Sequence, residues 1–449
     1  MSFEKLSNLY NILPLRASSL LRLFVLAATD RLLSAILTKD QALPGGITMF
    51  FAWPQWKKNL AALWFAQFSG MGAITGVLAF LPLYVEQLGI SDPAAQEWWA
   101  GLLLGIAPLF AAISGPHWGA YADRKGRKLM LERVTVAFFL VMLAMAYASS
   151  VYEMLVLRAL QGVFGGFTAA VLALVTSITP KEHIDFTMSV YQTAMIAGAA
   201  FGPLFGGFIA DTLGYSESFM SFAALSILSL IIIHLGVQED FQPQSTANRP
   251  SIGRQIRAMV AIPGLRAMLV IMFLIQFAIQ VISPILPLYV QRLAVDPAYV
   301  ASAVGAVVAA AALASAISSA AMGRLSQYWR YEATLLIASI LSAFSFALQG
   351  LAGSVLSLGL ARALGGLFMG AMLPTVNALA YQLIPPDQRG LAFGVTSSAA
   401  LVGNMIGPVA GGFLAITLGS RSVFWATALL FLLLTGWIYV QRNKLRQKS

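Results

Sequence analysis

Long apolar runs alternate with short charged or Pro/Gly-rich breaks from about residue 55 to the end of the chain. Most runs hold about 20 residues, the length that an α-helix needs to cross the hydrocarbon core of a bilayer. Transmembrane barrels instead alternate apolar and polar residues in segments of about ten. The pattern therefore predicts an all-α polytopic membrane protein with twelve spans, near residues 60–83, 98–121, 130–149, 153–177, 187–211, 218–237, 267–290, 299–322, 333–352, 356–382, 390–416 and 421–440.

Composition supports this class and excludes others. Of the 449 residues, 59% are hydrophobic and 10% are charged, and the mean hydropathy is +0.78. The absence of cysteine and the presence of only three histidines argue against a disulfide framework and a metal cage. The sequence shows no nucleophile–base constellation and no nucleotide-binding loop, so we expect neither enzymatic activity nor a cofactor.

The spans fall into two groups of six. A polar connector at residues 238–266 separates an N-terminal six-helix bundle, residues 56–237, from a C-terminal bundle, residues 267–441. A basic tail, residues 442–449, follows the second bundle.

Residues 1–55 leave two interpretations open. The stretch Ser18–Leu37 is apolar, but three charged residues interrupt it, and charge inside a span is costly. We interpret residues 1–55 as an N-terminal cytoplasmic extension, either a surface amphipathic helix or a mostly unstructured segment. Alternatively, translation starts at Met49 and the upstream residues do not belong to the protein.

The distribution of lysine and arginine predicts the orientation. If the loop Asp123–Lys128 is cytoplasmic, nineteen basic residues lie on the cytoplasmic side and two, Arg292 and Arg421, lie outside; this count omits the first 48 residues and two arginines within spans. The positive-inside rule then places both termini in the cytoplasm. Because this bias and attraction to anionic lipid explain most of the net charge of +10, we expect no nucleic-acid partner.

The two halves repeat each other at an offset of about 205 residues. Three pairs of similar segments share this spacing: Leu81–Leu88 with Leu286–Leu293, Arg158–Leu160 with Arg362–Leu364, and Gly198–Gly207 with Gly403–Gly412. Each half has an even number of spans, so the repeat is parallel and its axis lies along the membrane normal. This arrangement supports alternating access to a site between the halves.

Three motifs resemble signatures of the major facilitator superfamily. Gly119–Lys128 resembles its loop between the second and third spans, Arg158-x-x-Gln161-Gly162 resembles its fourth-span signature, and Gly198–Gly207 is similar to the fifth-span motif of drug:proton antiporters. The resemblance implies a monomeric twelve-helix exporter in a bacterial inner membrane. It also implies that small amphiphilic molecules are exported in exchange for protons.

The charged loop is the predicted gate. Gly119 removes a side chain where the second span must approach another helix, and Gly126 supplies a turn conformation that other residues avoid. Asp123 ends a helix, where the positive N-terminus of a neighbouring helix, the eleventh span, and Arg124 or Arg127 can stabilise it. Such a contact acts as a latch if it exists in one conformation only. The alternative is that the basic cluster merely anchors the loop to lipid phosphates.

Arg158 and Gln161 are the predicted proton-coupling residues, together with Asp123. An arginine in the bilayer centre costs at least ~2.5–3.5 kcal/mol, so we expect Arg158 to face the interior and to have a partner. Gln161, three residues later, shares its helix face. Snorkelling toward the outer surface is the alternative.

The second half lacks parts of both motifs. Gln327 stands at the place equivalent to Asp123, and Gly365 at the place equivalent to Gln161. We therefore expect an asymmetric gate on the cytoplasmic side.

The fifth-span glycines predict close helix packing. Gly198, Gly202 and Gly206 are spaced at four-residue intervals and form one smooth stripe, next to Gly207, while Pro203 removes a backbone hydrogen bond and allows a bend. We expect such a close-packed interface between the halves to prevent ion leak.

Amide, hydroxyl and thioether side chains at helical spacing are the candidates for a substrate cavity. Such groups suit an amphiphilic guest that makes a few hydrogen bonds. Ordinary helix packing is the alternative for each of them. The candidates are Gln67, Met71, Thr75, Gln192, Gln276, Gln280, Asn377 and Tyr381.

Proton coupling follows from the resemblance alone, because the first span contains no carboxylate. The acids that remain in the first half stand near the ends of spans and can be ordinary solvated residues: Glu86, Glu97, Glu153 and Asp211. Three further functions stay open, namely export of one metabolite such as a siderophore, proton-coupled uptake, and a receptor that has lost transport.

Overall fold

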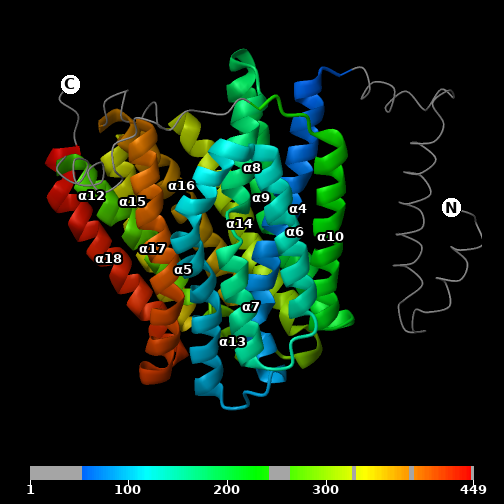
Figure 1. Ribbon diagram of the computed structural model, residues 1–449. Helices are drawn as coiled ribbons and strands as arrows, with labels where there is room; N and C mark the ends of the chain where they lie inside the picture. Colours follow the sequence, from blue (N-terminus) through cyan, green and yellow to red (C-terminus); the bar gives the residue numbers. More distant parts are fainter. Residues whose placement is uncertain (1–52, 242–262, 326–329, 384–388, 446–449) are drawn as a thin grey trace, which may run out of the picture. The chain divides into compact units, whose positions relative to one another are not determined.

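The computed structural model describes residues 53–241, 263–325, 330–383 and 389–445 (Figure 1). Side chains are described for residues 53–241, 265–322, 330–379 and 396–442. The predicted extension up to residue 52, most of the connector, Gln327 and the side chain of Tyr381 lie outside these ranges. Residues Gln55–Ser449 form one compact unit, which is the unit treated below.

The described residues form helices and no strands, which confirms the all-α prediction. The first half contains α4 (Gln55–Gln87), α5 (Pro93–Lys125), α6 (Arg127–Met145), α7 (Val151–Val163), α8 (Phe167–Ile178), η2 (Lys181–His183), α9 (Ile184–Thr212) and α10 (Tyr215–Gly236). The second half contains α12 (Pro263–Ile282), α13 (Ile285–Leu293), η3 (Pro297–Tyr299), α14 (Val300–Leu325), α15 (Tyr331–Leu351), α16 (Val355–Leu383), α17 (Arg389–Leu418) and α18 (Ser420–Leu445).

Eleven helical segments of the described residues are long and apolar enough to cross a membrane. The predicted third span, α6, is not among them, because four of its first seven residues are charged. Its remaining residues are apolar, and it packs against α10 and α8. We therefore treat α6 as a span whose charged first turns lie in the interface.

Two predicted spans are broken helices. The fourth divides into α7 and α8 at Gly166, which has a φ of 93°, and the seventh divides into α12 and α13 before Pro284. The apolar runs predict continuous helices at both places. Backbone groups freed by such a break need new partners inside a membrane, and Trp118 supplies one, since its Nε1–H donates to the carbonyl of Val163 at 2.7 Å.

The internal repeat has a counterpart in side-chain contacts. The Tyr84 hydroxyl donates to the carbonyl of Ala148 at 3.3 Å, and the Tyr289 hydroxyl donates to the carbonyl of Ala352 at 3.1 Å. The two tyrosines occupy the same place in the repeated segments Leu81–Leu88 and Leu286–Leu293. Each bond joins the first span of one half to the loop that follows the third span of the same half, so it helps to hold that half together.

Packing between helices also follows the repeat. In the first half α4 packs against α9 and α10, and in the second half α12 packs against α17 and α18. The halves meet where α5 packs against α17 and where α9 packs against α14. Under the repeat, α5 is equivalent to α14 and α9 is equivalent to α17. The α5–α17 and α9–α14 interfaces are therefore equivalent.

Consecutive spans run in opposite directions, so each loop lies at one of two ends. We call the end that holds the loop Lys125–Arg127 the basic end. The opposite end, which holds the loop Leu88–Asp92, is called the acidic end.

Candidate functional site

The charged loop is one residue long in the structure. Helix α5 ends at Lys125, Gly126 has a φ of 107°, and α6 begins at Arg127. A φ in this range strains residues that carry a Cβ. A Cβ at Gly126 would also lie 3.3 Å from Oε2 of Glu239. Both observations explain why glycine occupies this position.

Glu239 and Lys128 cap two helices reciprocally at the basic end. The Glu239 carboxylate accepts hydrogen bonds from the backbone N–H groups of Arg127, at 3.0 Å, and Lys128, at 2.8 Å. The Lys128 ammonium group donates to the carbonyls of His234, at 2.9 Å, and Val237, at 2.8 Å. An anion at a helix N-terminus and a cation at a C-terminus are both favourable, so this pair ties α6 to the end of α10.

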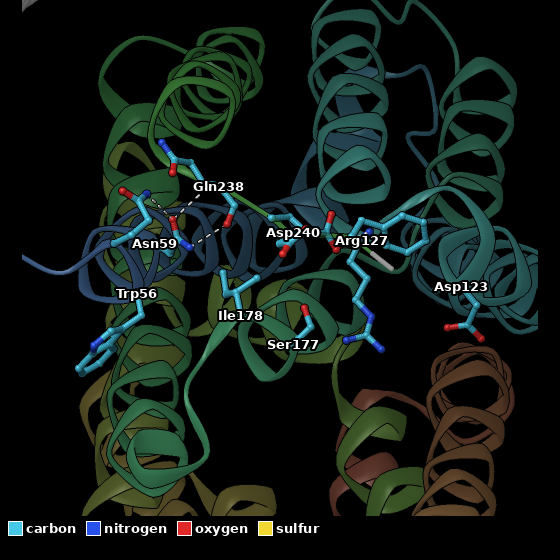
Figure 2. A pocket seen from close by; sticks show the side chains of 11 residues that line it. Trp56, Asn59, Asp123, Arg127, Ser177, Ile178, Gln238 and Asp240 are labelled. Carbon is cyan, nitrogen blue, oxygen red and sulfur yellow. Dashed lines mark hydrogen bonds between the residues drawn. The ribbon is translucent and has the colours of Figure 1, made fainter. Parts of the chain in front are cut away.

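Asn59 fixes the start of the connector. Its amide donates to the carbonyl of Gln238 at 2.9 Å, and its oxygen accepts from the backbone N–H of Gln238 at 3.0 Å (Figure 2). Asn59 is buried. Neither Asn59 nor Glu239 stands out in the sequence pattern, in which Glu239 is simply an acid shortly after the sixth span.

A cavity of about 700 Å³ opens beside the charged loop at the basic end (Figure 2). The cavity is bounded by the ends of α4, α5, α6 and α8 and by the start of the connector. Its lining residues are Gln55, Trp56, Asn59, Asp123, Arg127, Ser177, Ile178, Gln238, Glu239, Asp240 and Phe241.

Asp123 points toward the end of α17, the orange helix at the right of Figure 2. Helices α5 and α17 are antiparallel, because Gly105 lies against Met405 while Gly101 lies against Pro408 and Gly412. Asp123 stands 18 residues after Gly105, and α17 begins 16 residues before Met405. Asp123 therefore lies at the same depth in the bundle as the N-terminus of α17. This helix is the eleventh span, which the sequence predicts as the partner of Asp123. Its neighbour Arg127 donates from Nη1 to the carbonyl of Ala173 in α8 at 3.1 Å.

Gly119 lies in open space in this conformation. A Cβ at Gly119 or at Gly115 would meet no atom within 4 Å. The close helix approach expected at Gly119 is therefore absent here, whereas Gly101 and Gly105 on the same helix are tightly packed.

The glycine stripe of α9 packs mainly within the first half. A Cβ at Gly198 would lie 2.5 Å from the carbonyl oxygen of Phe68, and one at Gly202 would lie 2.6 Å from Oγ1 of Thr75; both neighbours are in α4. A Cβ at Gly206 would lie 3.1 Å from the ring of Phe222 in α10. The expected interface between the halves does not involve these three glycines.

The adjacent residues of α9 make the contact with the second half. Gly207 lies against the backbone of Ala301, and the carbonyl of Pro203 lies against Gly305, both in α14. In α17, a Cβ at Gly412 would likewise lie 2.7 Å from the carbonyl oxygen of Glu97 in α5.

Arg158 is buried and has two partners. Its Nε donates to the carbonyl of Leu103 in α5 at 3.0 Å, and its Nη1 donates to the side-chain oxygen of Gln161. The partner expected from helix spacing is thus the partner in the structure. Arg362, the repeat equivalent, instead lies over the ring of Phe346 at 5.7 Å from its centroid.

The predicted cavity residues divide into buried and exposed groups. Gln67 is fully buried and accepts from the Tyr191 hydroxyl at 3.4 Å, and Thr75 donates to the Met71 carbonyl at 2.9 Å. Half-buried Gln276 and Gln280 lie against Gly403 and Gly407 of α17. The exposed candidates among described side chains are Gln192 and Asn377.

Within the ranges that the structure describes, no group of three or more His, Cys, Asp or Glu side chains could hold a metal ion. The arrangement consists of helix caps, close glycine contacts and one buried arginine. These groups can hold or release helices, bind a proton and make hydrogen bonds to a guest.

Comparisons with solved structures show the same fold. A bacterial homologue of the human lysosomal transporter Spinster, in an inward-facing and occupied conformation, has a TM-score of 0.73 and 14% identity, covering 87% of this chain and 98% of that chain. A D-xylose–proton symporter has a TM-score of 0.68 and 15% identity, covering 86% and 97%.

Sequence comparisons show closer relatives. The chain is 34% identical over 393 residues to the multidrug resistance protein MdtG of Salmonella arizonae, covering 87% of this chain and 97% of that protein. It is 33% identical over 396 residues to MdtG of Escherichia coli, covering 88% and 97%. The model of the Major Facilitator Superfamily matches residues 20–144, 63–303 and 268–449. This multi-pass membrane protein therefore belongs to the Major Facilitator Superfamily of transporters and resembles the MdtG multidrug resistance proteins.

Proposed function

We propose that the protein exports small amphiphilic molecules from the cytoplasm across the inner membrane by alternating access, in exchange for protons. The similarity to multidrug resistance proteins supports small-molecule export. The positive-inside rule supports a cytoplasmic basic end and an outer acidic end, with both termini in the cytoplasm.

The packing of α5 is the observation that carries this proposal. All buried residues of α5 lie between Gln96 and Gly105, toward the acidic end. Toward the basic end no side chain of α5 is buried: the face that holds Trp118 is half-buried against the end of α7, and Ile113 and Tyr121 are exposed. A span packed between both halves would cover a second face as well. The uncovered side supports a conformation in which the halves are closed outside and separated toward the cytoplasm.

Alternating access requires a second conformation in which the basic end closes. We propose that Gly119 then packs against the second half and that Asp123, which points toward α17 in this structure, acts as the latch at the N-terminus of that helix, with Arg124, Gly126 and Arg127 shaping the loop. A contact that is stronger in one conformation biases the equilibrium between the two states.

Substrate and proton binding involve different residues in this proposal. Gln192 and Asn377 contact the guest, since they are exposed polar side chains within spans. Arg158 and Gln161 take part in proton coupling, because a buried arginine whose partner is a neutral amide responds to a nearby charge. The packing glycines and Pro203 of α9 maintain the shape of the first half.

Transport into everted membrane vesicles tests the proposal. Vesicles with an acidic interior should accumulate a fluorescent amphiphilic cation, and a protonophore should abolish the accumulation. The matched control is the same membrane carrying the Arg158→Ala variant. Accumulation that survives the protonophore would contradict proton exchange. If the vesicles accumulate no compound from a broad panel of amphiphilic drugs and dyes, multidrug export is contradicted and export of one specific substrate is favoured.

A further inference from the structure

An ion pair joins the two halves at the acidic end. The Glu97 carboxylate, at the start of α5, accepts from Nη2 of Arg292 in α13 at 2.7 Å and from the hydroxyl of Ser420 in α18 at 2.5 Å. Arg292 also donates to Ser420. Glu97 is 3% exposed, so its charge depends on these two partners for stabilisation.

A second carboxylate of the first half caps a helix of the second half. Asp211, near the end of α9, accepts from the backbone N–H groups of Ala301, at 3.0 Å, and Ser302, at 2.6 Å, in the first turn of α14. A carboxylate at a helix N-terminus satisfies otherwise free N–H groups and interacts favourably with the helix dipole.

One residue of each contact occupies the same place in the internal repeat. Glu97 and Ser302 are 205 residues apart, which is the offset of the repeat, so the acceptor of one contact corresponds to the donor of the other. The remaining partners do not correspond, since Asp211 is equivalent to Ile416 and Arg292 to Gln87. Both carboxylates come from the first half, and all their partners come from the second.

Other charged and polar groups around Glu97 are already engaged. Arg421, next to Ser420, donates from Nε to the Tyr289 hydroxyl at 3.3 Å. Glu86 lies 3.5 Å from the Gln291 amide. Glu153, on the helix packed beside α5, bonds to Ser149 within its own half. Arg292 is thus the cationic partner of Glu97.

We propose that Glu97, Arg292 and Ser420, together with the Asp211 cap on α14, form the gate that keeps the protein closed to the outside. The inference rests on the proposed function, because a gate has meaning only if the halves separate. Contacts between halves must break when the acidic end opens, whereas contacts such as Tyr84 with Ala148 lie within one half and persist. Loss of the Glu97 charge therefore favours the outward-open state.

Distance measurements between spin labels test the gate without a transport assay. The chain contains no cysteine, so Ser91→Cys and Val295→Cys place one label on each half at the acidic end without background. Both positions are exposed loop residues. The full-length double variant in lipid nanodiscs should give mainly a short distance. Adding Glu97→Gln should raise the long-distance population about tenfold relative to the short one.

Three further variants complete the test. The exchange Glu97→Arg with Arg292→Glu should restore the short distance, because it recreates a charge pair with opposite polarity. Glu153→Gln, an acid of the same end with no partner in the second half among the described contacts, should leave the distances unchanged. Asp211→Asn keeps the side-chain shape and should shift the label distances in the same direction as Glu97→Gln. It replaces Glu97→Gln in the test if the Glu97→Gln protein does not fold.

An unchanged distribution in both Glu97→Gln and Asp211→Asn would overturn the gate. A charge exchange that stays as open as Glu97→Gln would overturn the ion pair as its cause. Because these distances need no substrate, a positive result together with absent dye export would contradict the proposed multidrug function and leave the gate standing.

Discussion

Glu239 lies beyond the last helix of the first half, and its carboxylate accepts a 2.8 Å hydrogen bond from the backbone N–H of Lys128 at the start of α6. The two residues are 111 positions apart in sequence. The cap couples the connector between the halves to the charged loop.

Replacing Glu239 by Gln should destabilise the first half by ~0.5–2 kcal/mol, because the N-terminus of α6 loses its charged cap. Thermal unfolding of the purified protein, followed by tryptophan fluorescence, measures the change. Asp240→Asn is the matched control, since Asp240 lines the same cavity. Equal melting temperatures for both variants would show that the cap contributes nothing.

Replacing Asp123 by Asn should slow export about tenfold, because the charge proposed to engage α17 in the cytoplasm-closed state is lost. Initial rates of dye transport in everted vesicles give the turnover. Lys125→Gln, in the same loop, should retain most activity. Full turnover in Asp123→Asn would eliminate the latch.

Gly119→Ala should separate folding from transport. Because a Cβ at Gly119 meets nothing within 4 Å, the melting temperature should stay unchanged, but closure of the basic end should be hindered and export slowed. Parallel melting and transport measurements on one preparation test this. Unimpaired export would mean that Gly119 does not pack closely in either state.

Gly202→Ala should instead destabilise the protein by ~1–3 kcal/mol, the usual cost of overpacking. A Cβ there would lie 2.6 Å from Oγ1 of Thr75, and it would also clash with the backbone of Gly72. Gly436→Ala in α18, where a Cβ meets nothing within 4 Å, is the control. Equal unfolding temperatures for the two variants would contradict the predicted cost of overpacking at Gly202.

Arg158→Lys should reduce proton-driven export about tenfold or more. A lysine ammonium group cannot reproduce the two directions in which the guanidinium reaches Leu103 and Gln161. Arg362→Lys should be milder, since Arg362 lies over an aromatic ring. Transport with and without a pH gradient distinguishes coupling from substrate binding. Equal losses in both conditions would argue against a role in coupling.

Local features were predictable from the sequence, and long-range partners were not. The position of Gly126 followed from the charge pattern, and the Arg158–Gln161 contact from helix periodicity, because both depend on neighbours within a few residues. The burial of Gln67 was not predictable, since its surroundings come from α9. The same holds for the interface of the α9 glycines, because a stripe shows that a helix packs closely but not which helix it meets.

The class of the protein and its internal repeat are readable from the chain alone, because hydropathy over about 20 residues is a local property that the bilayer selects. How the two ends are held depends on tertiary packing. The partners of Glu97, Asp211 and Glu239 are 195, 90 and 111 residues away. Such contacts depend on how whole bundles pack against each other, and no local pattern records them.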